Sequence, residues 1–306
     1  LPIRVAVYNF TYADTGVPSV FAHFLCNRLE CSIADNPAFS LLARRELDQI
    51  LKEQNLTLSD LFDRKKCPEP GKLKGAQAIL TGTYGVYGEE VEINAKLIKV
   101  GTGDILSARF IKLPRGIIPE NIEIKVLDAE RIKQNYEELE GMFAEAEEGG
   151  FKVGEWDELG LRVWVDKGDG GLYREGEEMT VFLRADRDCY VRIYNIRSDG
   201  KSILIFPNKF HRDDRIEGGR VYRIPDKGYG FKFVVRKPLG PEMLLAVAST
   251  KPFRDRETIT RSLTESESFF LRGFGSVKEL KKHVREVIPV GIVGRAICRF
   301  ATAPGD

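Results

Sequence analysis

The stretch YVRIYNIRSDGKSILIFPN, residues 190–208, decides how the carboxy-terminal half of the chain folds. Two runs rich in β-branched and aromatic residues flank the tripeptide Ser-Asp-Gly at 198–200. Asp-Gly accepts the positive φ that a tight hairpin turn requires. The second run ends at Pro207, which has no N–H to donate to a sheet, and Asn208 can then bond to local backbone. We therefore predict a β-hairpin at the centre of a β domain.

Strand patterns continue on both sides of this hairpin. They occur at 161–165, 179–184, 220–224, 230–235 and 243–249. Six or more short strands separated by turns are typical of a β-sandwich, here predicted to be immunoglobulin-like. Ser276 and Glu279 form a capping box that predicts a helix to about Val287, and a last strand follows at 295–301.

The amino-terminal half has a different order of elements. An apolar strand at 3–10 precedes a helix that Pro18 opens, and a short strand at 39–43 precedes a second helix at 44–54. A hairpin at 76–100 and a strand at 105–113 complete a β-meander. The order βαβα plus meander predicts an α/β sandwich, so the whole chain is expected to be α+β.

A helix with apolar residues spaced by four and three is predicted between Glu120 and Glu148, and Gly149-Gly150 ends it. We expect its apolar stripe to pack on the chain's own domains. The predicted organisation is an α/β domain at 1–118, a helical connector at 119–150 and the β-sandwich at 151–306.

Both halves resemble known bacterial families. The motifs LARRELDQILKEQ, GAQAILTGTY and AKLIKVGTGDIL look like the amino-terminal region of CsgG/FlgO-type envelope lipoproteins. Residues 158–250 resemble a bacterial β-sandwich family of unknown function, whose recurring features match Tyr173, Gly176 and the Phe206-Pro207-Asn208 motif. The first resemblance implies an exported protein, periplasmic or outer-membrane-associated, with attachment only through a lipidated cysteine ahead of Leu1; a cytoplasmic location stays open.

Composition argues against two classes of partner. The net charge is +1, whereas binding to nucleic acid needs a concentrated basic face, so no nucleic-acid partner is predicted. The longest apolar run, 287–293, contains a proline and is far too short to cross a bilayer, so no transmembrane segment is predicted.

The chain has five cysteines and no C-x-x-C motif. Separate thiols are the favoured interpretation. If the protein is exported to an oxidising space, Cys189 and Cys298 are the predicted disulfide pair.

No catalytic, cofactor or metal site is predicted. The three histidines, His23, His211 and His283, show no ligand spacing, and no Ser-His-Asp or Cys-His arrangement is recognisable.

One segment is predicted to contact a partner. Phe210 follows the Pro-Asn corner and has no strand in which to bury its ring, while Phe206 is expected in the core. An exposed aromatic ring among Lys209, His211 and Arg212 suits a protein-binding surface.

These observations favour a non-enzymatic envelope protein that acts as an assembly, secretion-associated or interaction module, with a protein partner or a second copy as its target. Two alternatives stay open. One is a sensor with a small ligand between its two domains. The other is an enzyme whose site assembles from dispersed acids such as Asp213 and Asp214.

Overall fold

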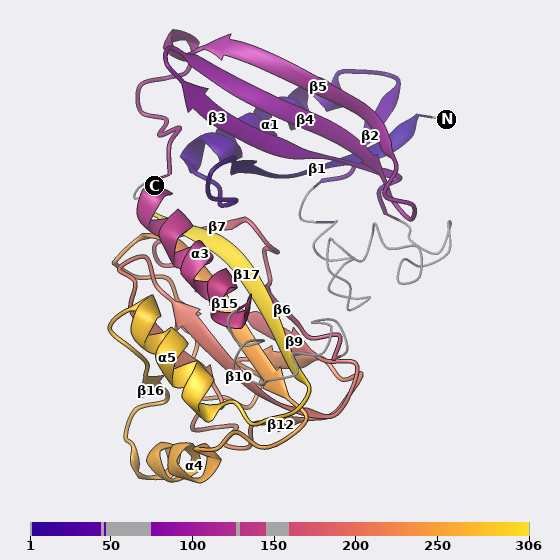
Figure 1. Ribbon diagram of the computed structural model, residues 1–306. Coiled ribbons are helices and arrows are strands. Elements are labelled where there is room, and N and C mark those ends of the chain that lie inside the picture. The colour runs from indigo at the N-terminus through magenta and orange to yellow at the C-terminus, as the bar shows by residue number, and fades with distance from the viewer. Residues whose placement is uncertain (1, 44–45, 47–74, 127–128, 145–158, 306) are drawn as a thin grey trace. The chain divides into compact units, whose positions relative to one another are not determined.

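The computed structural model describes residues 2–43, 46, 75–126, 129–144 and 159–305 (Figure 1). The predicted helix at 44–54 and the predicted boundary at Gly149-Gly150 lie outside these residues, apart from Glu46. The chain divides into two compact units. The amino-terminal unit is Leu1–Ala129 with Asp166–Leu172, and the carboxy-terminal unit is Glu130–Val165 with Tyr173–Asp306. The predicted domain limits at 118 and 150 stay predictions.

The amino-terminal unit is built on a five-stranded sheet in the order β2-β1-β3-β4-β5. Its elements are β1 (Ile3–Tyr12), α1 (Val20–Ala34), β2 (Phe39–Leu41), β3 (Ala78–Tyr87), β4 (Glu90–Lys99), β5 (Ile105–Pro114) and the short 3₁₀ helix η2 (Arg115–Ile117). Strand β1 runs parallel to β2 and β3, whereas β3, β4 and β5 form an antiparallel meander. Figure 1 shows α1 against one face of the sheet and β5 at its margin.

The start of α1 is fixed by the buried Tyr84 of β3. The hydroxyl groups of Ser19 and Tyr84 lie 2.7 Å apart, and the Ser19 N–H donates to the Tyr84 hydroxyl at 2.8 Å. The helix then buries Phe21 and Leu25 against the sheet, as the predicted apolar stripe requires. Burial raises the pKa of Tyr84, so its hydroxyl stays protonated and available for this contact.

The carboxy-terminal unit contains a seven-stranded sheet, a three-stranded sheet and a two-stranded ribbon. The strands are β6 (Arg162–Val165), β7 (Gly171–Arg174), β8 (Glu178–Met179), β9 (Val181–Arg184), β10 (Cys189–Ile196), β11 (Ser202–Phe206), β12 (Arg215–Ile216), β13 (Tyr222–Ile224), β14 (Phe233–Val234), β15 (Gly240–Ser249), β16 (Leu271–Arg272) and β17 (Val293–Ala303). The helices are α3 (Ala129–Ala144), α4 (Arg256–Glu265) and α5 (Val277–Val287).

The larger and the three-stranded sheets share one apolar core. Inward-facing residues of β6 and β9 pack with those of β10, β15 and β17, among them Val163, Leu183, Val191, Ile193, Leu244, Ala246 and Phe300. The predicted α+β class and the strand-rich carboxy-terminal region are therefore confirmed. The immunoglobulin-like topology stays a prediction.

The hairpin predicted from 190–208 is present as β10 and β11. Gly200 has φ +81°, and its N–H donates to the Arg197 carbonyl at 2.8 Å. The two strands pair in antiparallel register from Ile196–Ser202 to Ile193–Phe206, and β15 pairs with the other side of β10. The hairpin therefore lies inside the larger sheet.

Helices cover the outer face of that sheet. The serine half of the predicted capping box is present at the start of α5, where the Ser276 hydroxyl accepts from the Glu279 N–H at 3.2 Å. The Glu279 carboxylate accepts from the Gly275 N–H at 3.0 Å, one residue before the predicted donor. The helix buries Val277, Leu280 and Val284. In α3 the predicted apolar stripe is buried at Ile132, Tyr136 and Leu139.

Helix α4 was not predicted from the sequence, and an ion pair orders the segment that leads into it. The Arg192 side chain on β10 is 1% exposed, and its guanidinium bonds to the Asp255 carboxylate at 2.7 and 3.1 Å. Its charge also lies 4.4 Å from the centre of the Phe253 ring, and His283 of α5 lies 3.4 Å from the same carboxylate. The segment before α4 is thus fixed to the sheet by its contacts with the Arg192 guanidinium.

The predicted disulfide between Cys189 and Cys298 is wrong, because both are buried free thiols. Both strands pair with β15, but Tyr190 faces Ser249 whereas Cys298 faces Leu244. At the usual rise of a strand, this offset separates the two cysteines by roughly 15 Å or more. A bridge requires Cα atoms within about 7 Å. Burial raises the pKa of Cys189 to about 12, as expected for an inert thiol.

A buried acid lies where α3 packs on the sheet. Asn195 Nδ2 donates to Glu242 Oε2 at 3.0 Å, and a small pocket beside this pair is lined by Ile132, Asn135 and Tyr136 of α3. Burial raises the pKa of Glu242 to about 7, against the opposing effects of Asn195 and Arg197. The folded state therefore binds a proton that the unfolded chain releases near pH 4.5.

We predict that this proton makes stability depend on pH. The contribution of Glu242 is fully present below about pH 4.5 and is lost as the pH rises through about 7. Between pH 5 and 8 the free energy of unfolding of the wild type should fall relative to that of Glu242→Gln by about 2–3 kcal/mol. Urea unfolding of both proteins across this pH range measures the difference. A constant difference would contradict the prediction, and the exposed Glu257→Gln serves as the control.

We also predict that Asp255→Ala destabilises the protein by about 3 kcal/mol, because it leaves the buried Arg192 guanidinium without its counter-charge. The matched control is Glu257→Ala, which removes an exposed acid two residues away on α4. Thermal and urea unfolding of the two variants should differ clearly. Equal stability would show that Arg192 finds compensation elsewhere.

Candidate protein-binding surface

The loop after β11 is shaped by one buried amide. The Asn208 side chain is fully buried, and its Oδ1 accepts from the N–H groups of Phe210 and His211, each at 3.0 Å. Its Nδ2 donates to the Ile205 carbonyl at 3.1 Å. Asn208 therefore bonds to local backbone as the sequence indicated, and Phe206 lies in the core with no exposed surface.

The turn places Phe210 in a group of aromatic rings. Phe210 contacts Tyr229, Phe231 and Phe269, with ring centres 5.4 to 5.6 Å apart. Phe233 and Phe270 extend the group. We call these rings the aromatic surface: Phe210, Tyr229, Phe231, Phe233, Phe269 and Phe270.

The aromatic surface remains partly open to solvent. Phe210 is 40% exposed and Phe269 is 42% exposed. From the sequence we expected an exposed Phe210 ring with no strand in which to bury; the ring is partly exposed, and three other rings pack around it. The missed signal was the alternation of Tyr229, Phe231 and Phe233, which places three rings on one side of an extended segment.

The other three residues predicted to contact a partner have different environments. His211 turns inward, with its ring 5.0 Å from that of Phe206 and 5.8 Å from that of Tyr222, and burial lowers its pKa. Lys209 is half-buried and donates to the Ser266 carbonyl at 3.0 Å. Arg212 is exposed, and its Nε donates to the Lys209 carbonyl of the same loop at 3.3 Å.

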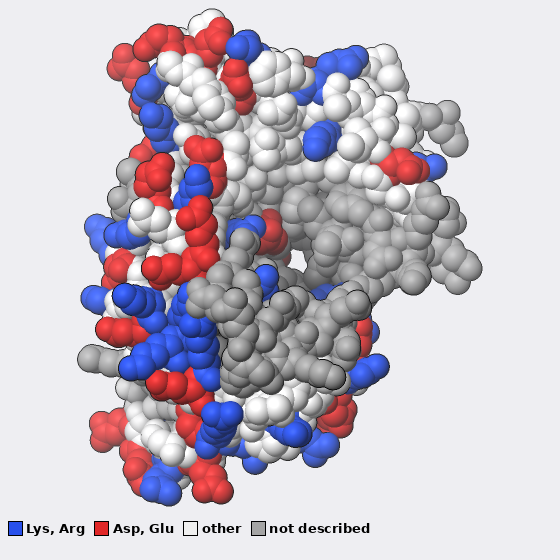
Figure 2. All heavy atoms as spheres, viewed as in Figure 1, with Lys and Arg blue, Asp and Glu red and all other residues white. Residues whose placement is uncertain are grey.

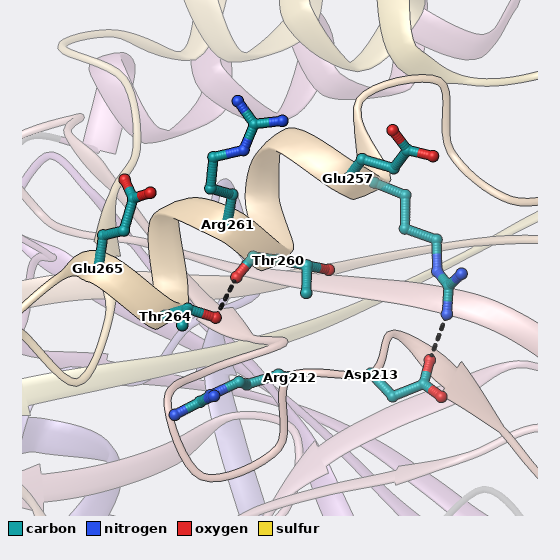
Figure 3. A pocket seen from close by; sticks show the side chains of 8 residues that line it. Arg212, Asp213, Glu257, Thr260, Arg261, Thr264 and Glu265 are labelled. Atoms are coloured by element: carbon teal, nitrogen blue, oxygen red, sulfur yellow. Dashed lines mark hydrogen bonds and ion pairs between the residues drawn. The ribbon is translucent and has the colours of Figure 1, made fainter.

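A charged groove of about 620 Å³ lies between this loop and α4 (Figure 3). It is lined by Arg212, Asp213, Arg256, Glu257, Thr260, Arg261, Thr264 and Glu265. Arg256 joins its two walls, because it bonds to Asp213 at 2.8 Å and to the buried Asp214 at 2.7 Å. The same loop therefore supplies Phe210 of the aromatic surface and one wall of the groove.

The two acids considered for an enzyme are paired with this arginine. Burial raises the pKa of Asp214, and the Arg256 guanidinium acts in the opposite direction. Such an arrangement fixes α4 on the loop. In the part of the chain that the structure describes, no three His, Cys, Asp or Glu side chains are placed to hold a metal ion.

Tyr173 and Gly176 support the sandwich. Tyr173 is fully buried and its ring meets that of Phe300 at 5.9 Å. Gly176 has φ +91°, a conformation that L side chains rarely adopt, and its N–H donates to the Val235 carbonyl at 2.9 Å. Both roles are structural.

Family comparisons confirm the two resemblances. Residues 4–93 match the family described as "Curli production assembly/transport component CsgG". Residues 172–252 match DUF4384, described as a domain of unknown function. The chain is thus similar to CsgG in its amino-terminal part and to a domain family of unknown function in its carboxy-terminal part. The Phe-Pro-Asn motif as a mark of that family stays a prediction.

Comparison with curated proteins finds no match. Among solved structures, the LpoB C-terminal domain from Salmonella enterica is 22% identical, covering 37% of this chain and 82% of that chain, with a TM-score of 0.28. Lipoprotein GNA1162 from Neisseria meningitidis is 14% identical, covering 45% and 97%, with a TM-score of 0.29.

None of the helices in the described ranges is both long and apolar enough to span a bilayer.

We predict that Asn208→Ala destabilises the protein by about 2 kcal/mol, because it leaves buried backbone groups of the loop without their partner. Asn36→Ala is the control, since Asn36 caps an exposed turn with one bond to the Ala38 N–H. Urea unfolding compares the two variants. A loss below about 0.5 kcal/mol for Asn208→Ala would show that the loop does not depend on this amide.

Proposed function

We propose that this chain is a non-enzymatic interaction module of the bacterial cell envelope, and that it binds a protein partner through the aromatic surface. The observation that carries the proposal is the partial exposure of Phe210 and Phe269 at the edge of six rings in mutual contact. Aromatic side chains provide most of the binding energy at many protein interfaces, because they bury a large area at little cost in side-chain entropy.

The surface is suited to recognition because its rings are already fixed. Phe210 is set by the Asn208 turn, and Phe269 packs on Phe231, whose ring centre is 5.6 Å away. Binding of a partner would therefore lose little side-chain entropy at these rings. Arg212 and the charged groove beside the loop would add orientation at the rim of the interface.

The family match supports an envelope setting. The printed description of the CsgG family names assembly and transport, and an assembly or secretion-associated role for this chain is part of the proposal. We infer a periplasmic or outer-membrane-associated location, with any membrane attachment through a lipidated segment ahead of Leu1.

We predict that Phe210→Ser combined with Phe269→Ser abolishes partner binding in a folded protein. The test is a pull-down from a bacterial envelope extract with immobilised wild type, the double variant and Val290→Ser. Val290 is a matched control because it is 57% exposed in the same unit, outside the aromatic surface. Circular dichroism verifies that each variant is folded.

A protein retained by the wild type and by Val290→Ser, but lost with the double variant, would support the proposal. Equal retention by all three proteins would overturn it. If none of the three immobilised proteins retains a protein from an extract of intact envelope proteins, that result would also contradict the proposal.

A further inference from the structure

Strand β5 presents an unguarded edge in the amino-terminal unit. It is the last strand of its sheet, and no strand of the described residues pairs with its outer side. None of its residues is buried, and Ile105, Leu106, Phe110 and Ile111 are all exposed, Phe110 by 54%. The surface over β4 and β5 is mainly uncharged in Figure 2. A long apolar edge of this kind is a template for a further strand.

The direction of the backbone groups along β5 follows from a hydrogen bond just beyond its carboxy-terminal end. The Arg115 N–H donates to the Glu89 carbonyl at 2.8 Å, and bonded pairs alternate along an antiparallel ladder. Ser107, Arg109, Ile111 and Leu113 therefore direct their backbone groups toward β4. Those of Ala108, Phe110 and Lys112 point outward, and the Arg109 guanidinium donates to the outward carbonyl of Ala108 at 3.1 Å.

Two irregularities limit the usable edge. The register between β4 and β5 shifts at Leu106, which is a bulge, and Pro114 lacks an N–H. The regular stretch between them is 107–113, and Phe110 lies at its midpoint. The positive charge of Lys112 does not block strand pairing here, because two acids of β4 neutralise it. Its Nζ lies 3.1 Å from Glu90 and 2.9 Å from Glu92.

We propose that β5 pairs with β5 of a second copy of this chain, antiparallel, about a two-fold axis through Phe110. In this register Phe110 faces Phe110, Arg109 faces Ile111, Ala108 faces Lys112, and Ser107 faces Leu113. The outward backbone groups of Phe110 bond to each other across the axis, and those of Ala108 bond to those of Lys112. Arg109 exchanges its own bond to the Ala108 carbonyl for this ladder.

The charges and the register of β5 favour a second copy of this strand as the partner at its edge. A register centred on Arg109 would place two guanidinium groups directly opposite each other, whereas the register through Phe110 moves them to the diagonal and places no like charges directly opposite. It also uses every residue of the regular stretch and stops at the bulge and the proline on both sides. The symmetric, isologous contact closes on itself and leaves one continuous sheet.

Sedimentation velocity of the full chain tests the association. We expect wild type to dimerise reversibly between about 1 and 100 μM, the range typical of small interfaces. Phe110→Lys, which opposes two cations at the axis, and Ala108→Pro, which removes an outward N–H, should both be monomeric. Ile117→Lys, an exposed position beyond the strand, should dimerise like wild type. A monomeric wild type, or a Phe110→Lys variant that dimerises equally well, overturns the proposal.

Oxidative crosslinking tests the register, in a background with Cys31 and Cys67 replaced by serine. Phe110→Cys should crosslink to itself across the axis, since directly opposed residues lie about 5 Å apart. Arg109→Cys should crosslink several-fold less, because its symmetry mate lies on the diagonal at about 7–8 Å. Equal yields would overturn the register. A dimer lost with Phe210→Ser and Phe269→Ser, but kept with Phe110→Lys, would assign self-association to the aromatic surface instead.

Discussion

The carboxy-terminal unit depends on one buried charged side chain on its larger sheet. Arg192 lies on the outer face of β10, and a buried guanidinium is tolerated only with a counter-charge. Asp255 provides it from the turn before α4, while Phe253 covers the guanidinium and His283 of α5 approaches the same carboxylate. This one ion pair therefore joins the sheet to the start of α4 and to α5.

The loop that carries Phe210 of the aromatic surface is fixed at both ends by polar contacts. At one end, the Asn208 amide satisfies the backbone of the turn, and at the other, Arg256 of α4 binds Asp213 and Asp214. Phe210 lies between these two fixed points. A partly exposed aromatic ring on a loop with so few degrees of freedom is preorganised for contact, which links the packing of the unit to its proposed function.

The two units offer different kinds of surface. The aromatic surface consists of side chains from loops, so a partner would be recognised by the shape and stacking of the rings. The edge of β5 offers backbone groups in a fixed spacing, so it would be recognised by the register of a strand. The proposed partner binding and the proposed self-association are therefore tested by separate substitutions in the two units.

The sequence by itself determined the local elements. The β10–β11 hairpin, the apolar strand β1, the β3–β4–β5 meander, and the cap of α5 follow from turn chemistry and periodicity, which act between neighbours in the chain. Tertiary structure decided the rest. Helix α4 follows a segment held by Arg192, the cysteines are separated by the register of β15, and Phe210 meets rings from segments about 19 to 60 residues further along. Such contacts join distant residues, and no local pattern records them.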